Sequence, residues 1–247
     1  TATAILTGSR DVRAETPKRG GRLKVGYNIH GPSDTLDPVL NTDGLAYSRN
    51  RAHLNRLVQF NPDLTVRPEL AESFEVNSDA TEFTFSLRKD VTFHDGKDLT
   101  ADDVVYSMNR HLGENSVSKA KTLVGMISEW KKLDSHTVKA VLSSPNADLI
   151  PTLATFHFSI LQDGCEEKSG YFNKTIGTGP YMVEEFSPGV RSISKKNPNY
   201  WREGGWVDQI EMFGIVDNSA RVNAVVSGAV DMAATIDPKS YKQVNQA

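Results

Sequence analysis

Apolar residues recur at two different periods along this chain, and the two periods alternate without a regular order. Phe83, Phe85 and Leu87 repeat every second residue, as on a strand with one buried face. Shortly afterwards Val104 and Met108 repeat at helical spacing. The regular strand-helix repeat that a barrel of parallel strands needs is not present in the sequence. The pattern therefore predicts a mixed α/β (α+β) fold, built from lobes and not from a barrel.

The individual elements follow from the same periods together with turn and capping residues. Thr100, with Asp103 three residues later, predicts a helix start of the capping-box type, and Gly113 is its expected end. Gly177 and Gly179 are expected to supply backbone conformations that other residues avoid. Strands are expected at 23–28, 74–76, 82–87, 137–142, 156–161, 181–186, 190–195 and 207–215, and further helices after Gly44 through Leu57, around 147–153 and between Asn218 and Gly228.

The first residues resemble the end of a secretion signal. Thr1–Ser9 is small and apolar, and Val12-Arg13-Ala14 offers a cleavage site before Glu15. We therefore expect residues 1–20 to be a signal-peptide remnant with an N-terminal arm, and the protein to be periplasmic. The alternative is a disordered arm on a cytosolic protein.

Charge and cysteine content exclude several classes of function. The net charge is −3 and the Lys and Arg residues are scattered, so no nucleic-acid partner is expected. No segment reaches the ~20 consecutive apolar residues of a membrane span, so direct membrane insertion is not expected. Cys165 is the single cysteine, which excludes an intrachain disulfide and a multi-cysteine metal site.

Seven spaced segments, taken together, resemble one protein family. The most specific is 91–107, VTFHDGKDLTADDVVYS. The others, in the family's order, are LDP at 36–38, RPELAESF at 67–74, FTFSLRK at 83–89, GTGPY at 177–181, NPNYW at 197–201 and SGAVDM at 227–232. By these segments the chain resembles the extracellular solute-binding proteins of family 5, the dipeptide, oligopeptide and nickel type.

This resemblance implies a periplasmic-binding-protein-like fold with two lobes around a cleft. It implies that residues 21–44 and 163–247 form a discontinuous first lobe and that residues 45–162 form an inserted α+β subdomain. Relatives continue beyond the position of Ala247, so the distal lobe, with most of the ligand-contacting side chains, is expected to be missing here.

The resemblance also implies a function. The protein would be the substrate-binding component of an ABC importer, would capture a peptide or similar small solute, and would deliver it to a membrane permease. It would be a monomer and not an enzyme. Opines, oligosaccharides, glutathione-like compounds and nickel chelates are alternative ligands within this fold. From other classes, a secreted hydrolase using the same cleft and a receptor or chaperone role without transport remain open.

Candidate ligand-binding residues come from matching the family's pattern. Asn41, Thr42, Asp43 and Gly44 follow the LDP segment, at the loop whose counterparts line the cleft. An equally strong interpretation of Asp43 is that it caps the following helix.

Two further residues, Phe156 and His157, are expected to form part of the cleft's inner wall. Core packing is the commoner role for a phenylalanine such as Phe156. His30 or His157 near the cleft leaves transport of a metal complex open, although no metal site or cofactor of the protein itself is expected.

The remaining reactive residues have simpler structural interpretations. His94 precedes Asp95-Gly96, a turn sequence, and no nucleophile or metal-ligand spacing accompanies it. The segment 177–180 lacks the Lys and Ser or Thr of a phosphate-binding loop and is expected to be a tight structural crossing at the base of the cleft. Cys165 has no recognisable histidine partner and is expected to be a bystander.

Overall fold

The structure is a computed structural model and describes residues 18–29 and 31–241. The proposed cleavage site and most of the predicted signal remnant, residues 1–17, lie outside the described residues, as does His30. Within the two described ranges, no helix is both long and apolar enough to pass through a membrane.

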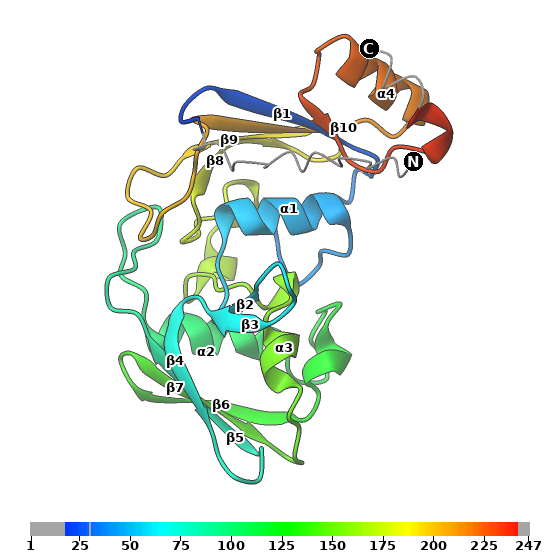
Figure 1. The fold of residues 1–247 in the computed structure, drawn as a ribbon. Coiled ribbons are helices and arrows are strands. Elements are labelled where there is room, and N and C mark those ends of the chain that lie inside the picture. Colours follow the sequence, from blue (N-terminus) through cyan, green and yellow to red (C-terminus); the bar gives the residue numbers. More distant parts are fainter. Residues whose placement is uncertain (1–17, 30, 242–247) are drawn as a thin grey trace, which may run out of the picture.

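One large sheet combines the start of the chain with its later part. Its strand order is β11-β1-β10-β9-β8 (Figure 1), in which β1 runs parallel to both of its neighbours and β9 antiparallel to both of its own. Arg22 pairs with Gln209 at one end of the β1–β10 ladder, and Tyr27 pairs with Gly214 at the other. The strands are β1 (Arg22–Tyr27), β8 (Tyr181–Ser187), β9 (Arg191–Lys196), β10 (Gln209–Gly214) and β11 (Met232–Ala233).

A second, antiparallel sheet has the order β4-β5-β7-β6. Its buried face packs against helices α2 and α3 in the largest hydrophobic core, which includes Phe83, Phe85 and Trp130. A small ladder of β2 and β3 joins the same core. The strands are β2 (Val58–Phe60), β3 (Val66–Pro68), β4 (Ala71–Val76), β5 (Glu82–Leu87), β6 (Ile127–Asp134) and β7 (Thr137–Leu142), and the helices are α2 (Ala101–Asn109) and α3 (Leu149–Leu153).

Helix α1 (Gly44–His53) lies between these two parts of the molecule, under the five-stranded sheet (Figure 1). Leu45 and Ala52 pack against Tyr181 and Met212 of that sheet. The last helix, α4 (Asn218–Val226), begins at its N-cap Asp217 and lies beside β11 and β1. Five short 3-10 turns complete the described elements: Lys121–Val124, Phe156–Phe158, Cys165–Glu167, Tyr171–Asn173 and Pro238–Ser240.

The capping box predicted at the start of α2 is confirmed. Asp103 accepts hydrogen bonds from the backbone nitrogen of Thr100 at 2.9 Å and from its hydroxyl at 3.0 Å. Asp103 is fully buried, and it also accepts from the ammonium of Lys97 and from the backbone nitrogen of Asp163. One carboxylate therefore joins the helix start to two flanking loops.

Two predicted helix ends were wrong. α1 stops at His53 and not at Leu57, because Leu54 is already extended and Arg56 bridges to Ser159 as in a strand. α2 stops at Asn109 and not at Gly113. The next residue, Arg110, instead pairs bidentately with Asp37 at 2.9 and 2.7 Å.

Two further predictions need correction. The segment 156–161 is not a strand, because Phe156–Phe158 forms a 3-10 turn and Ser159 makes only an isolated bridge. Gly177 and Gly179 do not have φ values in the left-handed region. They are required by space: a Cβ on Gly179 would lie 2.5 Å from the backbone carbon of His53. The division into a first lobe and an inserted subdomain stays a prediction.

Candidate ligand-binding site

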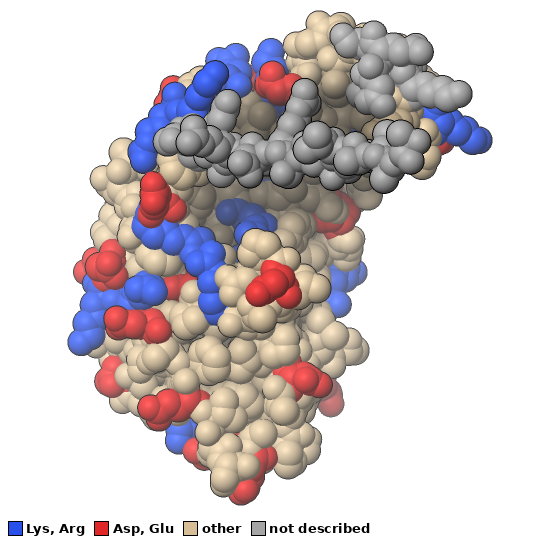
Figure 2. Space-filling view, viewed as in Figure 1, with Lys and Arg blue, Asp and Glu red and all other residues tan. Residues whose placement is uncertain are grey.

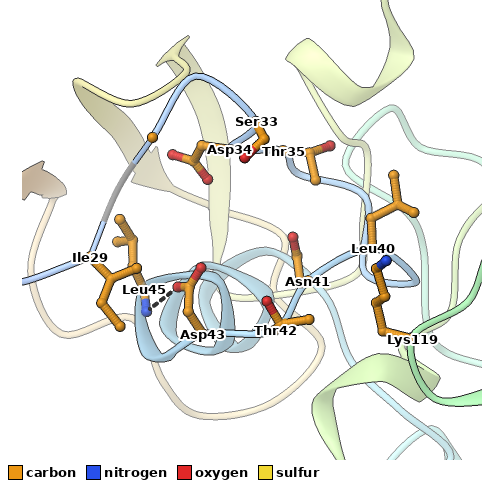
Figure 3. A pocket seen from close by; sticks show the side chains of 11 residues that line it. Ile29, Ser33, Asp34, Thr35, Leu40, Asn41, Thr42, Asp43, Leu45 and Lys119 are labelled. Atoms are coloured by element: carbon orange, nitrogen blue, oxygen red, sulfur yellow. Dashed lines mark hydrogen bonds between the residues drawn. The ribbon is translucent and has the colours of Figure 1, made fainter.

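A pocket lies where the loop after β1 meets the N-terminus of α1 (Figure 3). Its volume is about 540 Å³. Three polar side chains, Ser33, Asp34 and Thr35, form one wall, and the start of α1 forms the wall facing them. The lining residues are Ile29, Gly31, Ser33, Asp34, Thr35, Leu40, Asn41, Thr42, Asp43, Leu45 and Lys119.

The wall at α1 is built by helix capping. Asp43 has extended backbone angles, and its Oδ1 accepts hydrogen bonds from the backbone nitrogens of Leu45 and Ala46, both at 2.9 Å. Helices begin at such residues because the first backbone N–H groups lack partners within the helix. Capping therefore uses one carboxylate oxygen of Asp43, while the side chain still lines the pocket (Figure 3).

The opposite wall contains a buried ion pair. Both carboxylate oxygens of Asp34 lie 2.6 Å from Nη1 of Arg49, and the two side chains are only 7% and 1% exposed. Arg49 also donates from Nε to the hydroxyl of Ser192 on β9 at 3.0 Å. The pair fixes the loop at residues 33–35 to α1 and to the large sheet, and it neutralises the charge of Asp34.

The structure brings three of the predicted residues together. Asn41, Thr42 and Asp43 line the pocket, whereas Gly44 is the exposed first residue of α1 and is not among the lining residues. Thr42 is exposed to solvent, and Asn41 is buried with its Nδ2 3.3 Å from the Oδ1 of Asn50. Whether these residues bind a ligand stays a prediction.

Phe156 and His157 lie behind the wall at α1 and do not line the pocket. His157 Nε2 lies 2.9 Å from the carbonyl oxygen of Asn41, so the ring donates this hydrogen bond. The ring of Phe156 meets that of Tyr47 edge-on at 5.5 Å between centroids, and its carbonyl accepts from Asn50. The two residues thus support the loop at 41–43 from behind, and a ligand role for them stays a prediction.

Burial lowers the pKa of His157 below its usual value, although the hydrogen bond to Asn41 opposes this shift. Because Nε2 donates, Nδ1 is the unprotonated ring nitrogen, and it is buried without a partner among the residues that the structure describes. The arrangement holds a neutral imidazole beside the loop.

Sequence reasoning missed Ser33, Asp34, Thr35 and Lys119 as pocket residues. The first three lie between β1 and α1, directly before the LDP segment at 36–38, and no motif singled them out. Lys119 lies 74 or more positions after the rest of the lining and comes between α2 and β6. No local pattern signals such a contact, because it depends on how two distant segments pack.

The other chemical candidates have structural partners. His94 accepts at Nδ1 from the backbone nitrogen of Gly177 at 3.1 Å and donates from Nε2 to the carbonyl of Gly179 at 3.0 Å. The imidazole therefore fixes the glycine crossing. Within residues 18–29 and 31–241, no group of three or more His, Cys, Asp or Glu side chains is arranged to hold a metal ion.

Cys165 is fully buried, and its Sγ lies 3.5 Å from the hydroxyl of Tyr106. Burial raises the pKa of its thiol above the usual value. A nucleophilic cysteine needs the opposite shift, because the thiolate is the reactive form. This environment does not support a catalytic role for Cys165.

Charged side chains of both signs lie on the face of the molecule that Figure 2 shows. Figure 2 shows positive and negative side chains interspersed over the visible face, without a stripe of one sign.

Comparison with known proteins decides the family. The model for bacterial extracellular solute-binding proteins, family 5 Middle, matches residues 65–247. The chain belongs to this family. The resemblance drawn from the seven segments is thus confirmed, and the family is one of solute-binding proteins and not of enzymes.

Individual relatives differ in their ligands. The dipeptide-binding protein of Escherichia coli K12 is 34% identical over 221 residues, which are 79% of this chain and 41% of that protein. The structure of AgaA from A. tumefaciens R10 in complex with agropinic acid has a TM-score of 0.85 at 31% identity, and the match covers 92% of this chain and 46% of AgaA. A nickel ABC transporter structure from Bacillus halodurans has a TM-score of 0.80 at 28% identity, with 92% and 45% coverage.

These matches confirm the mixed α/β fold of the peptide-binding type of periplasmic binding protein. The chain spans less than half the length of each of these three relatives.

Proposed function

We propose that this chain is part of the substrate-binding component of an ABC importer, which captures a peptide or similar small solute in the periplasm and delivers it to a membrane permease. The observation that carries the proposal is the pocket of about 540 Å³ between the loop at 33–35 and the start of α1, in a chain of a solute-binding family. Pockets for small molecules have volumes of about 300–1,000 Å³.

A peptide is the first ligand class to consider. Polar groups from two wall segments face this pocket, whereas Ile29, Leu40 and Leu45 supply its apolar lining. An extended peptide suits such a mixed wall, because main-chain hydrogen bonds hold it with little demand on side-chain identity. The 34% identity to a dipeptide-binding protein supports the same class.

An opine is the second candidate class. AgaA, whose structure contains agropinic acid, is 31% identical to this chain over 92% of its length. Peptides and opines are both small polar solutes, so the pocket's mixed lining accommodates either class.

The proposed mechanism is capture without chemical change. Two lobes close around the solute, exclude water and satisfy its hydrogen bonds, and the closed protein, a monomer, then docks on the permease. Asn41, Thr42 and Asp43 contribute side chains to the solute, Gly44 contributes backbone, and Phe156 and His157 hold this loop in place. No bond is made or broken, which distinguishes this mechanism from that of a secreted hydrolase.

Native mass spectrometry of the full-length protein, purified from its own host, tests the proposal. We expect an intact small molecule to co-purify, and its mass would identify a peptide or an opine. Recovery of cleaved substrate would contradict the proposal and support the hydrolase.

A variant that fills the pocket links this result to the site. Thr42→Trp introduces a large ring at an exposed lining position, so we expect loss of the co-purified ligand with the fold retained. Thr122→Trp, at an exposed position outside the lining, is the matched control. Equal ligand content in Thr42→Trp and the control would place the binding site elsewhere.

A further inference from the structure

Lys119 is the cation among the side chains that line the pocket, and its backbone is held in place. The backbone nitrogen of Lys119 donates a hydrogen bond to the carbonyl oxygen of Val39 at 2.9 Å. Val39 directly precedes Leu40, which lines the pocket. The residues on either side, Ser118 and Ala120, are only 8% and 1% exposed. The segment therefore has little freedom, and only the side chain of Lys119 extends outward.

Buried polar contacts strengthen this anchorage. The hydroxyl of Ser118 lies 2.6 Å from Nδ1 of His111 and accepts from the backbone nitrogen of Ala120 at 3.1 Å. His111 is itself buried, with its ring 4.7 Å from that of Phe158 between centroids. The position of Lys119 is thus set by the core and not by a free loop.

Neither acidic side chain in the described lining of the pocket forms an ion pair with Lys119. Asp34 is paired with Arg49, and Asp43 caps α1. Lys119 makes no side-chain hydrogen bond or ion pair with any residue in the described part of the chain. The neighbouring Lys121, in contrast, donates from Nζ to the carbonyl of Glu114 at 2.7 Å.

Lys119 and Leu40 lie on the side of the pocket away from Ile29 and Leu45 (Figure 3). A ligand that spans the pocket from the start of α1 thus ends near an ammonium group. An ammonium without a partner in a partly enclosed site favours an anionic oxygen, because charge-assisted hydrogen bonds to carboxylates are stronger than neutral ones. We infer that Lys119 binds a carboxylate of the captured solute and makes the protein selective for solutes with a free acid group.

This inference rests on the proposed function and narrows its ligand class. The free acid has two possible sources, the C-terminus of a peptide or the acid group of an opine. Titration calorimetry on the full-length protein separates them with two probe pairs: trialanine with trialanine amide, and agropinic acid with its carboxamide.

We expect the wild-type protein to bind the acid of one pair about tenfold more tightly than its amide, as a charge-assisted hydrogen bond predicts. Lys119→Met should lose that preference by weakening the acid and leaving the amide unchanged, and Lys119→Arg should retain it. Lys89→Met is the control, since Lys89 is an exposed lysine outside this pocket and carries the same charge.

The outcomes separate this inference from the function on which it rests. An acid preference that persists unchanged in Lys119→Met overturns the role of Lys119 but leaves capture of that solute class intact. If the wild-type protein binds an acid and its amide with equal affinity, the role of Lys119 is likewise overturned, while capture of that solute class stays intact. Binding of no member of either pair overturns the proposed ligand classes and this inference together. Circular dichroism of each variant confirms that the fold is retained.

Discussion

The backbone nitrogen of Gly179 donates a hydrogen bond to the carbonyl oxygen of His53 at 3.0 Å. The bond joins the last residue of α1 to the segment that leads into β8. His94, whose ring binds the backbone at Gly177 and Gly179, holds the same segment. The loop at 41–43 before α1 and the glycine crossing at the end of this helix are therefore parts of one packed unit.

A methyl group at position 179 should destabilise the protein. A Cβ there would lie 2.5 Å from the backbone carbon of His53 and 2.6 Å from the carbonyl oxygen of Ala52, so backbone atoms must move. We expect Gly179→Ala to lower the free energy of unfolding by about 1–3 kcal/mol or more in urea titrations. Gly125→Ala is the control, because its nearest neighbouring atoms would be 3.9 Å away. Equal stability of the two variants would show that the crossing can relax.

Local sequence signals predicted the parts of the fold that local interactions determine. The alternation of Phe83, Phe85 and Leu87 correctly gave β5 and its buried face, because a strand with one face in the core has a period of two. Thr100 and Asp103 correctly gave the start of α2, because both partners of a capping box lie within three residues.

Long-range contacts determine the features that sequence patterns did not predict, such as the end of α1 and the place of Lys119. α1 ends at His53 because Arg56, three residues later, is bound through its backbone and side chain by the buried carboxylate of Glu69. Lys119 reaches the pocket only because its segment packs beside Val39. The residues Asn41, Thr42 and Asp43 were found through the family resemblance, since a polar loop before a helix has no pattern that distinguishes a ligand wall from an ordinary cap.

Removing one partner of the Asp34–Arg49 ion pair should destabilise the protein more than removing both partners. Arg49→Met leaves the carboxylate of Asp34 in a site where it is 7% exposed, and we expect a loss of about 3–5 kcal/mol in the free energy of unfolding. The double variant Asp34→Asn/Arg49→Met should recover part of that loss, because no charge is then left unpaired. Lys131→Met, which removes an exposed partner of Glu129, should change stability by less than about 1 kcal/mol. If the stability losses of the single variants Asp34→Asn and Arg49→Met sum to that of the double variant, this account is contradicted.

Cys165 should be unreactive in the folded protein. Its side chain is 0% exposed, and burial raises the pKa of its thiol, so few thiolates are present at neutral pH. We expect a chromogenic disulfide reagent to modify it at least about 100-fold more slowly in buffer than in denaturing urea. A Cys165→Ala chain carrying Ser128→Cys, at an exposed position on β6, should react quickly in both conditions. Rapid modification of the native wild-type chain would reopen a nucleophilic role.

Two buried histidines should make the fold less stable as the pH falls below about 6.5. Burial lowers the pKa of His53 to about 3 and that of His111 to about 3, with Arg49 and Arg110 among the nearby charges that add to these shifts. In the unfolded chain both rings have a pKa of about 6.5, so between these values the unfolded state binds more protons and stability decreases with falling pH. We expect the free energy of unfolding in urea to fall by about 2–4 kcal/mol from pH 7.5 to pH 5, above the range where most carboxylates titrate. His53→Gln should make this decrease shallower, because a neutral amide takes up no proton in either state. An identical pH dependence in His53→Gln and the wild-type chain would contradict the assignment.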